Sequence, residues 1–322
     1  MTDAGQAPPA GDWEPMSDDW RPAVGNLVFV GGTGRSGTHV LARLLNRHPR
    51  FAEVPIESRF HCNKRGLPDL LEGRVTLAGF LSKLRDFWWH RVRVDGQPRG
   101  LYNLLTRRQL DAAVERFEVD YPSDPLPACR GLFVDLLWPL AAEQGKPGLV
   151  EMSSHNLREA QTLRQLFGEA RFVHTVRDGR DAASSVTTKT WGPDSIVKGI
   201  DWWTDRLRAI ETGVRGTGDG AGDALSPAEL CVVVLDDLVW GDRKGEYGRL
   251  LDFLGVDDDA GMREFFDEQM HPGAAHLARW REGLGRIERW RVQRRYEAAL
   301  KALERDGNHV ARPLIDAYER LG

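Results

Sequence analysis

Residues 27–46 begin as an apolar run, pass through a glycine-rich turn and continue as an amphipathic helix. This order constrains the fold more than any other feature. The run LVFV opens into GGTGRSGT, and the next segment places apolar side chains on one helical stripe: Val40, Leu41, Leu44 and Leu45. A strand, a glycine loop and a helix in that order aim backbone amides and a helix N-terminus at one point, as phosphate-binding loops do. The sequence therefore predicts an α/β fold with an anion-binding loop.

Three further short apolar runs, at 148–152, 171–176 and 230–235, are rich in β-branched residues. Such runs are typical of buried parallel strands. Because they alternate with amphipathic segments, the sequence predicts a three-layer α/β fold with a parallel sheet flanked by helices, similar to that of P-loop nucleoside triphosphatases. The chain after the last run is predicted to be helical.

The sequence predicts one large domain over 23–322, preceded by a flexible arm at 1–22. A helical insertion is expected over about 76–144, broken at the polar, proline-bearing segment 121–130, and it is placed to cover a pocket. The glycine-rich segment 212–227 is expected to be a flexible linker.

The net charge of −4 gives no general reason to expect nucleic acid or an anionic membrane as a partner, so any anion site should be local. Cys62, Cys129 and Cys231 are widely spaced and odd in number, which argues against a disulfide framework and a cysteine zinc site, and favours a cytoplasmic location. No apolar stretch approaches the about 20 residues that a membrane-spanning helix needs.

The glycine loop departs from the P-loop pattern GxxxxGK[ST] at two positions. Gly32 and Gly37 match, but Thr38 stands in place of the lysine and His39 in place of the hydroxyl that binds Mg²⁺. Arg35, inside the loop, supplies a positive charge, and its planar fork suits two oxygens of a phosphate or sulfate. The alternative is a tight strand-to-helix turn without a ligand.

A second candidate anion site lies in RFVHTVRDGRDAASSV. A strand is predicted to end at Arg177, Asp178 is a helix N-cap candidate, and Ser185 follows Arg177 by eight residues. Eight residues are slightly more than two helical turns, so an arginine and a serine at this spacing could share one anion. The alternative is an Asp-capped helix with arginine–aspartate pairs on its surface.

These two segments resemble the nucleotide-binding signatures of sulfotransferases that use 3′-phosphoadenosine-5′-phosphosulfate (PAPS). The resemblance covers about 26–283 and includes VEMSSHN and LDDLVWGDRKGEYGRLLDFLGV. It implies that Arg177 and Ser185 hold the 3′-phosphate, and more weakly that Trp280 and Arg281 lie near the nucleotide. It also implies that the 5′-phosphosulfate is held by the loop residues Gly34, Arg35, Ser36, Gly37, Thr38 and His39. The chain departs from the bacterial pattern at 152–154, where Met-Ser-Ser replaces Lys-Thr-Pro.

The resemblance implies transfer of a sulfuryl group from PAPS, without metal, to a hydroxyl or less readily an amine of a small-molecule, glycan or lipid acceptor. The acceptor and the oligomeric state do not follow from the sequence. Two rival hypotheses remain. One is a magnesium-dependent P-loop kinase, with an aspartate of LCVVVLDD (230–237) beside the metal; the other is a nucleotide-binding protein without catalytic activity.

Two residues are candidates for the base that accepts the proton of the acceptor. The resemblance favours Glu57, which lies 22 residues after Arg35, as in the Golgi-type relatives; His155, 22 residues before Arg177, matches the spacing of the cytosolic relatives. His61 is a weaker third candidate. A histidine base is expected to titrate near pH 6–7. The alternatives are an ion pair of Glu57 with Arg59 and a helix cap at His155.

The tryptophans in helical stretches are expected to pack in the core, and the segments 60–90 and 190–205 are expected to flank the acceptor. These residues are Trp88, Trp89, Trp191, Trp202 and Trp203.

Overall fold

The computed structural model describes residues 26–92, 96–216, 224–273 and 277–321. Its centre is a five-stranded, all-parallel sheet in the order β2-β3-β1-β4-β5. The strands are β1 (Leu27–Gly31), β2 (Phe51–Glu53), β3 (Gly148–Glu151), β4 (Arg171–Val176) and β5 (Leu230–Val234). The predicted runs form β1, β3, β4 and β5. Strand β2 was not predicted, because three residues are too few to show a strand periodicity.

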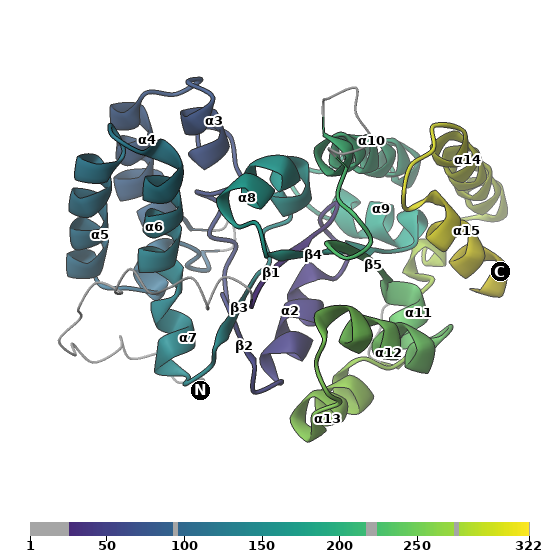
Figure 1. The fold of residues 1–322 in the computed structure, drawn as a ribbon. Coiled ribbons are helices and arrows are strands. Elements are labelled where there is room, and N and C mark those ends of the chain that lie inside the picture. Colours follow the sequence, from purple (N-terminus) through teal and green to yellow (C-terminus); the bar gives the residue numbers. More distant parts are fainter. Residues whose placement is uncertain (1–25, 93–95, 217–223, 274–276, 322) are drawn as a thin grey trace.

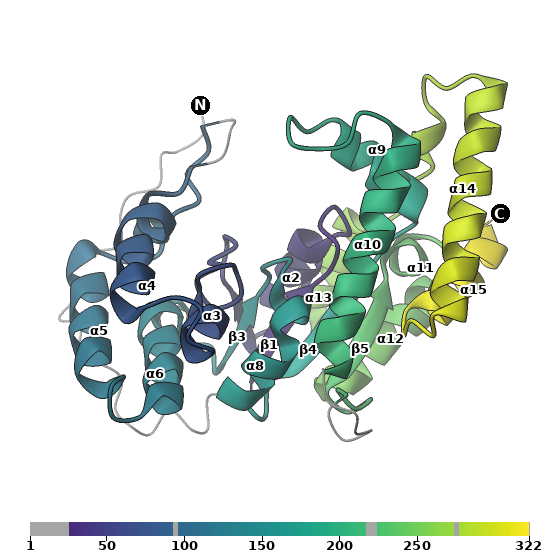
Figure 2. The same ribbon diagram turned by 90° about the horizontal axis from the view of Figure 1, so that it is seen from above.

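Helices cover both faces of the sheet, which confirms the predicted three-layer α/β fold (Figures 1 and 2). Side chains alternate between the two faces of a strand. Leu27 and Phe29 of β1 therefore pack into an apolar cluster with the helices between β2 and β4, whereas Val28 and Val30 pack against α2 (Thr38–Asn46) and the helices that follow β5. This burial on both faces holds the loop after β1 between two layers of helices.

The helical insertion begins slightly earlier than predicted, and it lies between β2 and β3. Its elements are α3 (Leu67–Leu71), α4 (Leu77–Lys83), η2 (Leu84–Trp88), η3 (Leu101–Asn103), α5 (Arg107–Asp120), α6 (Pro125–Leu137) and α7 (Pro139–Glu143). The predicted break is wrong at its second half, because Pro125 starts α6. Proline fits the first turn of a helix, where its missing N–H group has no partner to lose.

The remaining helices flank β4 and β5 and form the C-terminal part. They are η4 (Asn156–Glu159), α8 (Ala160–Leu166), α9 (Gly179–Thr187), α10 (Ile196–Arg215), α11 (Leu235–Val239), α12 (Arg243–Leu254), α13 (Ala260–Gln269), η5 (Arg279–Arg281), α14 (Arg286–Arg305) and α15 (Ala311–Leu321). The linker expected at 212–227 is wrong at its start, because α10 continues to Arg215; residues 217–223 lie outside the described part, as does the predicted arm at 1–22.

The tryptophans divide between core and surface. Trp88 and Trp203 are almost fully buried and Trp89 is 7% exposed, as expected of core residues. Trp191 is 58% exposed and lies in the turn before α10, so the prediction of core packing is wrong there. Its ring centroid lies 6.2 Å from that of Trp202. None of the helices within the described ranges is long and apolar enough to cross a bilayer.

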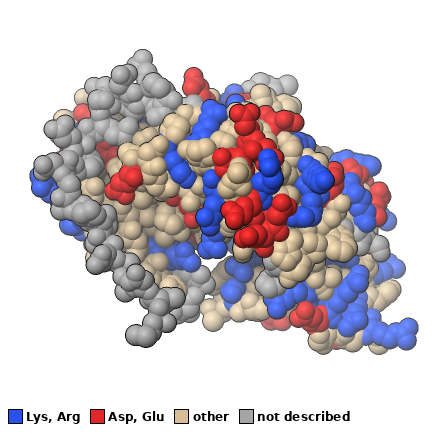
Figure 3. All heavy atoms as spheres, turned by 90° about the horizontal axis from the view of Figure 1, so that it is seen from below, with Lys and Arg blue, Asp and Glu red and all other residues tan. Residues whose placement is uncertain are grey.

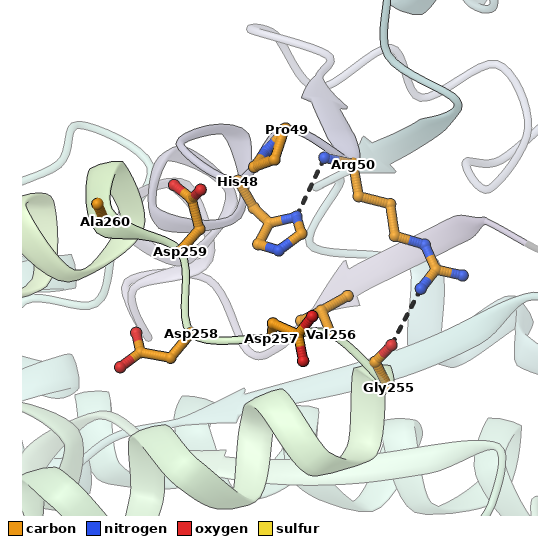
Figure 4. Close-up of a pocket in the computed structure, with 9 residues that line it drawn as sticks. All are labelled: His48, Pro49, Arg50, Gly255, Val256, Asp257, Asp258, Asp259 and Ala260. Carbon is orange, nitrogen blue, oxygen red and sulfur yellow. Dashed lines mark hydrogen bonds between the residues drawn. The ribbon is translucent and has the colours of Figure 1, made fainter.

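A surface hollow of about 430 Å³ lies at the edge of the sheet where the strands begin (Figure 4). His48 and Arg50 directly precede β2, and Arg50 donates a hydrogen bond of 3.0 Å to the carbonyl of Gly255 after α12. Aspartates 257–259 line the hollow, so it does not suit an anion. On the face seen from below, acidic and basic side chains are interspersed (Figure 3).

Candidate active site

The glycine loop, residues 32–37, connects the end of β1 to α2. Gly34, Arg35 and Gly37 have positive φ angles of 81°, 63° and 96°. Left-handed residues within such a turn direct successive backbone amides toward a common concave side, which favours anions. Helix α2 begins at Thr38 and has no acidic residue in its first turn, so no carboxylate of its own offsets the positive end of the helix.

The loop lies tightly against β4. A Cβ atom at Gly32 would be 2.6 Å from the carbonyl oxygen of Thr175, so this position excludes any side chain. Ser36 is fully buried, and its Oγ has no hydrogen-bond partner. A buried hydroxyl without a partner is unusual in a folded protein, and here it leaves a hydrogen-bond donor inside the glycine loop. His39, one residue into α2, is exposed.

Arg35 connects the glycine loop to the second predicted motif. Its Nε donates a hydrogen bond of 2.9 Å to the Oγ of Ser185, which lies in α9. The structure thus brings the two motifs together. It corrects the geometry expected for Arg177 and Ser185: Arg177 precedes the N-cap residue Asp178, so the two do not belong to one helix, and Ser185 contacts the loop arginine.

Asp178 caps α9 as predicted, by accepting a hydrogen bond of 2.8 Å from the backbone of Arg180. Arg177 lies 3.8 Å from Asp181 in an ion pair. Asp181 in turn accepts hydrogen bonds from the backbone amides of Ala278 and Trp280, at 2.8 and 3.0 Å. The C-terminal segment is therefore fixed next to Arg177.

Trp280 and Arg281 differ in their access to a ligand. The side chain of Trp280 is 4% exposed, and Arg180 lies 4.9 Å from its ring centroid. The side chain of Trp280 therefore packs beneath the surface, where it is not accessible to a ligand. Arg281 is exposed, and it follows Trp280, whose backbone amide is bound by Asp181.

Glu57 lies in the segment after β2 and contacts the segment that follows β3. Its Oε1 accepts a hydrogen bond of 3.3 Å from the backbone amide of Ser154, and the carbonyl of Ser154 accepts one of 3.5 Å from the amide of Gly32. Its other oxygen accepts a hydrogen bond of 2.9 Å from the Nε of Arg59. Ser154, where the bacterial pattern has proline, thus connects Glu57 to the glycine loop.

The electrostatics keep Glu57 ionised. Burial would raise the pKa of Glu57, but the adjacent charge and hydrogen bonds of Arg59 outweigh it, and His39 and Arg91 add to the lowering. The predicted ion pair with Arg59 is therefore present. A carboxylate in this state can accept a proton, although its low pKa makes it a weak base in the ground state.

His155 lies in the same site, within the segment between β3 and η4. Burial, reinforced by the charges of Arg158 and Arg59, lowers the pKa of His155 to about 4. The expectation that a histidine base here titrates near pH 6–7 is therefore wrong. Both Glu57 and His155 are unprotonated at neutral pH.

His61 is enclosed in a polar network that the sequence analysis did not find. It is fully buried, and its Nε2 lies 3.1 Å from Glu151 Oε2 and 2.9 Å from Asn156 Oδ1. Ser58 and Ser153 donate to the same carboxylate through their hydroxyl groups, at 3.0 and 2.7 Å. Because His61 has no access to a ligand, its candidacy as the base is wrong.

The buried network is ionic. Burial would raise the pKa of Glu151, but the charge of His61 and hydrogen bonds from His61, Ser153 and Asn156 lower it to about 2. Burial would lower the pKa of His61, and Cys62 and Glu151 raise it well above its ordinary value. Glu151 ends β3, and polar residues directly after a buried strand were the sequence signal that could have revealed the network.

Comparison with known proteins decides the family. A model of the sulfotransferase family matches residues 27–260, from the first strand to the start of α13. The chain belongs to the sulfotransferase family. It is similar to the sulfotransferase domain of the olefin synthase of Synechococcus PCC 7002, with 20% identity and a TM-score of 0.49 over 84% of this chain and 93% of that domain.

Two other solved sulfotransferases are similar at lower scores. The sulfotransferase domain of the curacin biosynthetic pathway has 15% identity and a TM-score of 0.43, over 73% of this chain and 75% of that domain. A sulfotransferase of Mycobacterium tuberculosis has 15% identity and a TM-score of 0.42, over 84% of this chain and 76% of that protein.

In this sulfotransferase the two aspartates after β5 are engaged in the fold. Asp236 is 3% exposed and accepts a hydrogen bond of 2.7 Å from the backbone amide of Asp178, and Asp237 forms an ion pair with Arg320 of α15. Burial and the charge of Asp178 raise the pKa of Asp236 to about 7. These contacts do not favour the magnesium-binding role that the kinase hypothesis gives them.

Proposed function

We propose that this sulfotransferase transfers the sulfuryl group of PAPS to an acceptor hydroxyl, or less readily an amine. The hydrogen bond between Arg35 and Ser185 is the observation that carries the proposal, because it joins the two predicted anion sites into one surface. The buried, unpartnered Ser36 Oγ and the positive-φ turn fit a phosphosulfate group.

In this proposal two groups of residues bind the two anionic ends of the donor. The loop from Gly34 to His39, with Arg35 as its cation, holds the 5′-phosphosulfate; Arg177 and Ser185 hold the 3′-phosphate. Arg281, which follows the Trp280 backbone held by Asp181, is assigned to the nucleotide side by the family resemblance. No metal is required, because amides, the helix N-terminus and guanidinium groups supply the positive potential.

The reaction is an in-line substitution at sulfur. The acceptor oxygen forms a bond to sulfur as the bond from sulfur to the phosphate oxygen breaks, and the electron pair of that bond leaves with the nucleotide. Glu57 accepts the acceptor proton, held in place by the amide of Ser154. His155 is the alternative base, since it is neutral and lies in the same site.

Thermal unfolding with different nucleotides tests the donor. We expect 3′-phosphoadenosine-5′-phosphate (PAP) to raise the melting temperature well above the shift given by AMP, ATP or ATP with Mg²⁺, since selective binding stabilises the folded state by mass action. Sulfation measured with labelled PAPS should survive EDTA. A larger shift with ATP and Mg²⁺ than with PAP would favour the kinase hypothesis instead.

The acceptor class proposed on family grounds is a small molecule, glycan or lipid with a free hydroxyl. Specificity in such enzymes depends on loops and insertions, and the charge of Arg91, in the insertion between β2 and β3, acts on Glu57. Screening these three acceptor classes with labelled PAPS identifies the acceptor.

A further inference from the structure

Two arginines lie side by side on a hairpin of the insertion, between η2 and η3. The backbone amide of Arg99 donates a hydrogen bond of 2.8 Å to the carbonyl of Arg91, and Val92 pairs with Pro98 as an antiparallel bridge. A Cβ atom at Gly100 would lie 1.9 Å from the carbonyl oxygen of Trp89, so the base of the hairpin packs closely on the chain before it. These contacts therefore fix the backbone at the base of the hairpin, which carries both arginines.

The hairpin lies on the Glu57 side of the site. Arg91 is among the charges that lower the pKa of Glu57, and Arg99 is among those that lower the pKa of His39. Such effects need charges that are close to the affected group. The charge of Arg91 therefore acts on the proposed base, and that of Arg99 on the first turn of α2.

Neither arginine has a carboxylate partner among the residues that the structure describes. Arg59 pairs with Glu57, but no ion pair forms at Arg91 or Arg99. The Nη1 of Arg91 is enclosed and has no hydrogen-bond partner, and burial lowers the pKa of Arg91 to about 10. The charges of Glu57 and Glu151 act on Arg91 without an ion pair in the described part of the chain, and an enclosed N–H group without an acceptor is unfavourable. This arrangement therefore suits an acceptor oxygen supplied by a ligand.

We propose that the acceptor carries an anionic group, a phosphate or a carboxylate, and that Arg91 and Arg99 bind it while Glu57 faces the hydroxyl. This rests on the proposed function and names its substrate class. The donor does not account for these arginines: its anionic groups are assigned to the loop after β1 and to Arg177 with Ser185 after β4, whereas the hairpin belongs to the insertion.

Calorimetric titration of the PAP-saturated protein separates this proposal from the proposed function. The probes are phenyl phosphate, phenylacetate and benzyl alcohol, which share a ring and differ in charge; the first two distinguish a phosphate from a carboxylate. We expect an anionic probe to bind at one site, at least about tenfold more tightly than benzyl alcohol. Arg91→Gln and Arg99→Gln should each weaken that probe about tenfold and leave PAP affinity unchanged.

Two further variants serve as controls. Arg108→Gln removes an exposed arginine of α5, in the same insertion, and should change nothing. Arg91→Lys keeps the positive charge, so it should retain most of the probe affinity. Its melting temperature should also stay that of the wild type, which would exclude misfolding as the cause of the weaker binding in Arg91→Gln.

Three results would overturn the inference. They are equal binding of benzyl alcohol and the anionic probes, unchanged probe affinity in both glutamine variants, and a loss of PAP affinity in those variants in place of probe affinity. Failure of the wild type to bind PAP is seen before any probe is added. That result would remove the proposed function, and this inference with it.

Discussion

The Nε of Arg35 donates a hydrogen bond of 2.9 Å to the Oγ of Ser185, across 150 residues of sequence. The pair joins the turn after β1 to the helix after β4, two neighbouring strands of the sheet. In a parallel sheet the carboxyl ends of neighbouring strands meet at one edge, which is where α/β proteins bind ligands. A cation and a hydroxyl in contact there suit the proposed binding of a donor with two anionic ends.

Replacing Ser185 tests this surface. Ser185→Ala removes both a hydroxyl donor to the 3′-phosphate and the partner of Arg35, so PAP affinity should fall about 10- to 100-fold, the effect of losing a hydrogen bond to a charged group of about 1.5–3 kcal/mol. AMP affinity should change much less, because AMP has no 3′-phosphate. Calorimetry measures both, and Ser184→Ala, the adjacent residue in α9, is the matched control.

Replacing Glu57 tests the base. Glu57→Gln keeps the shape and the hydrogen bond from Ser154 but cannot take a proton, so kcat should fall about 10²- to 10⁴-fold while the Kd for PAP stays within about twofold. His155→Gln should reduce kcat far less. If His155→Gln has the larger effect and Glu57→Gln keeps wild-type kcat, the roles of the two residues are reversed.

The pH profile of kcat should show no decrease caused by protonation of a histidine near pH 6–7. The pKa of Glu57 is lowered by Arg59 and that of His155 is lowered to about 4, so both candidate bases are already unprotonated above about pH 5. With PAPS and acceptor saturating, kcat should be constant between pH 6 and 8 and fall only toward pH 4. A fall in kcat centred near pH 6.5 would instead show that a histidine with an ordinary pKa must be deprotonated for turnover.

The buried pair of Glu151 and His61 should stabilise the fold strongly. Glu151→Gln leaves a buried imidazolium without its anion, and breaking such a pair costs about 3–5 kcal/mol of the free energy of unfolding. Urea denaturation measures it. Glu118→Gln breaks an exposed pair with Arg85 and should cost less than about 1 kcal/mol. A similar loss in both variants would contradict the role of the network.

The same network predicts the pH range in which the pair of Glu151 and His61 stabilises the fold most. The pKa of Glu151 falls from 4.5 to about 2 on folding, so its contribution is present above pH 4.5 and is lost as pH falls toward 2. The pKa of His61 is raised from 6.5, so its contribution is complete below pH 6.5 and is lost as pH rises through the folded value. The difference between wild type and Glu151→Gln should therefore be greatest between about pH 4.5 and 6.5.

The fold followed from local patterns. The four apolar runs, the glycine turn and the Asp178 cap each act through nearby residues, so the parallel sheet and both anion motifs could be predicted from the sequence. Strand β2 is too short for a periodic pattern, and Pro125 reads as a break although it starts a helix. The family supplied what chemistry alone leaves open, namely the identity of the donor.

The contacts that organise the site join residues far apart in sequence. The bond from Arg35 to Ser185, the enclosure of His61 by Glu151 and the neighbourhood of Arg91 and Glu57 depend on how three segments pack together, and no local spacing encodes that. For the same reason the lowered pKa of His155 could not be foreseen, because burial and distant arginines cause it.

A crystal structure of the PAP complex tests the central claim most directly. We predict that the 5′-phosphate lies against the loop from Gly34 to His39 and that the 3′-phosphate contacts Arg177 and Ser185, with the Arg35–Ser185 pair between them. A nucleotide bound at another edge of the sheet, or a 3′-phosphate that contacts neither Arg177 nor Ser185, would contradict the account.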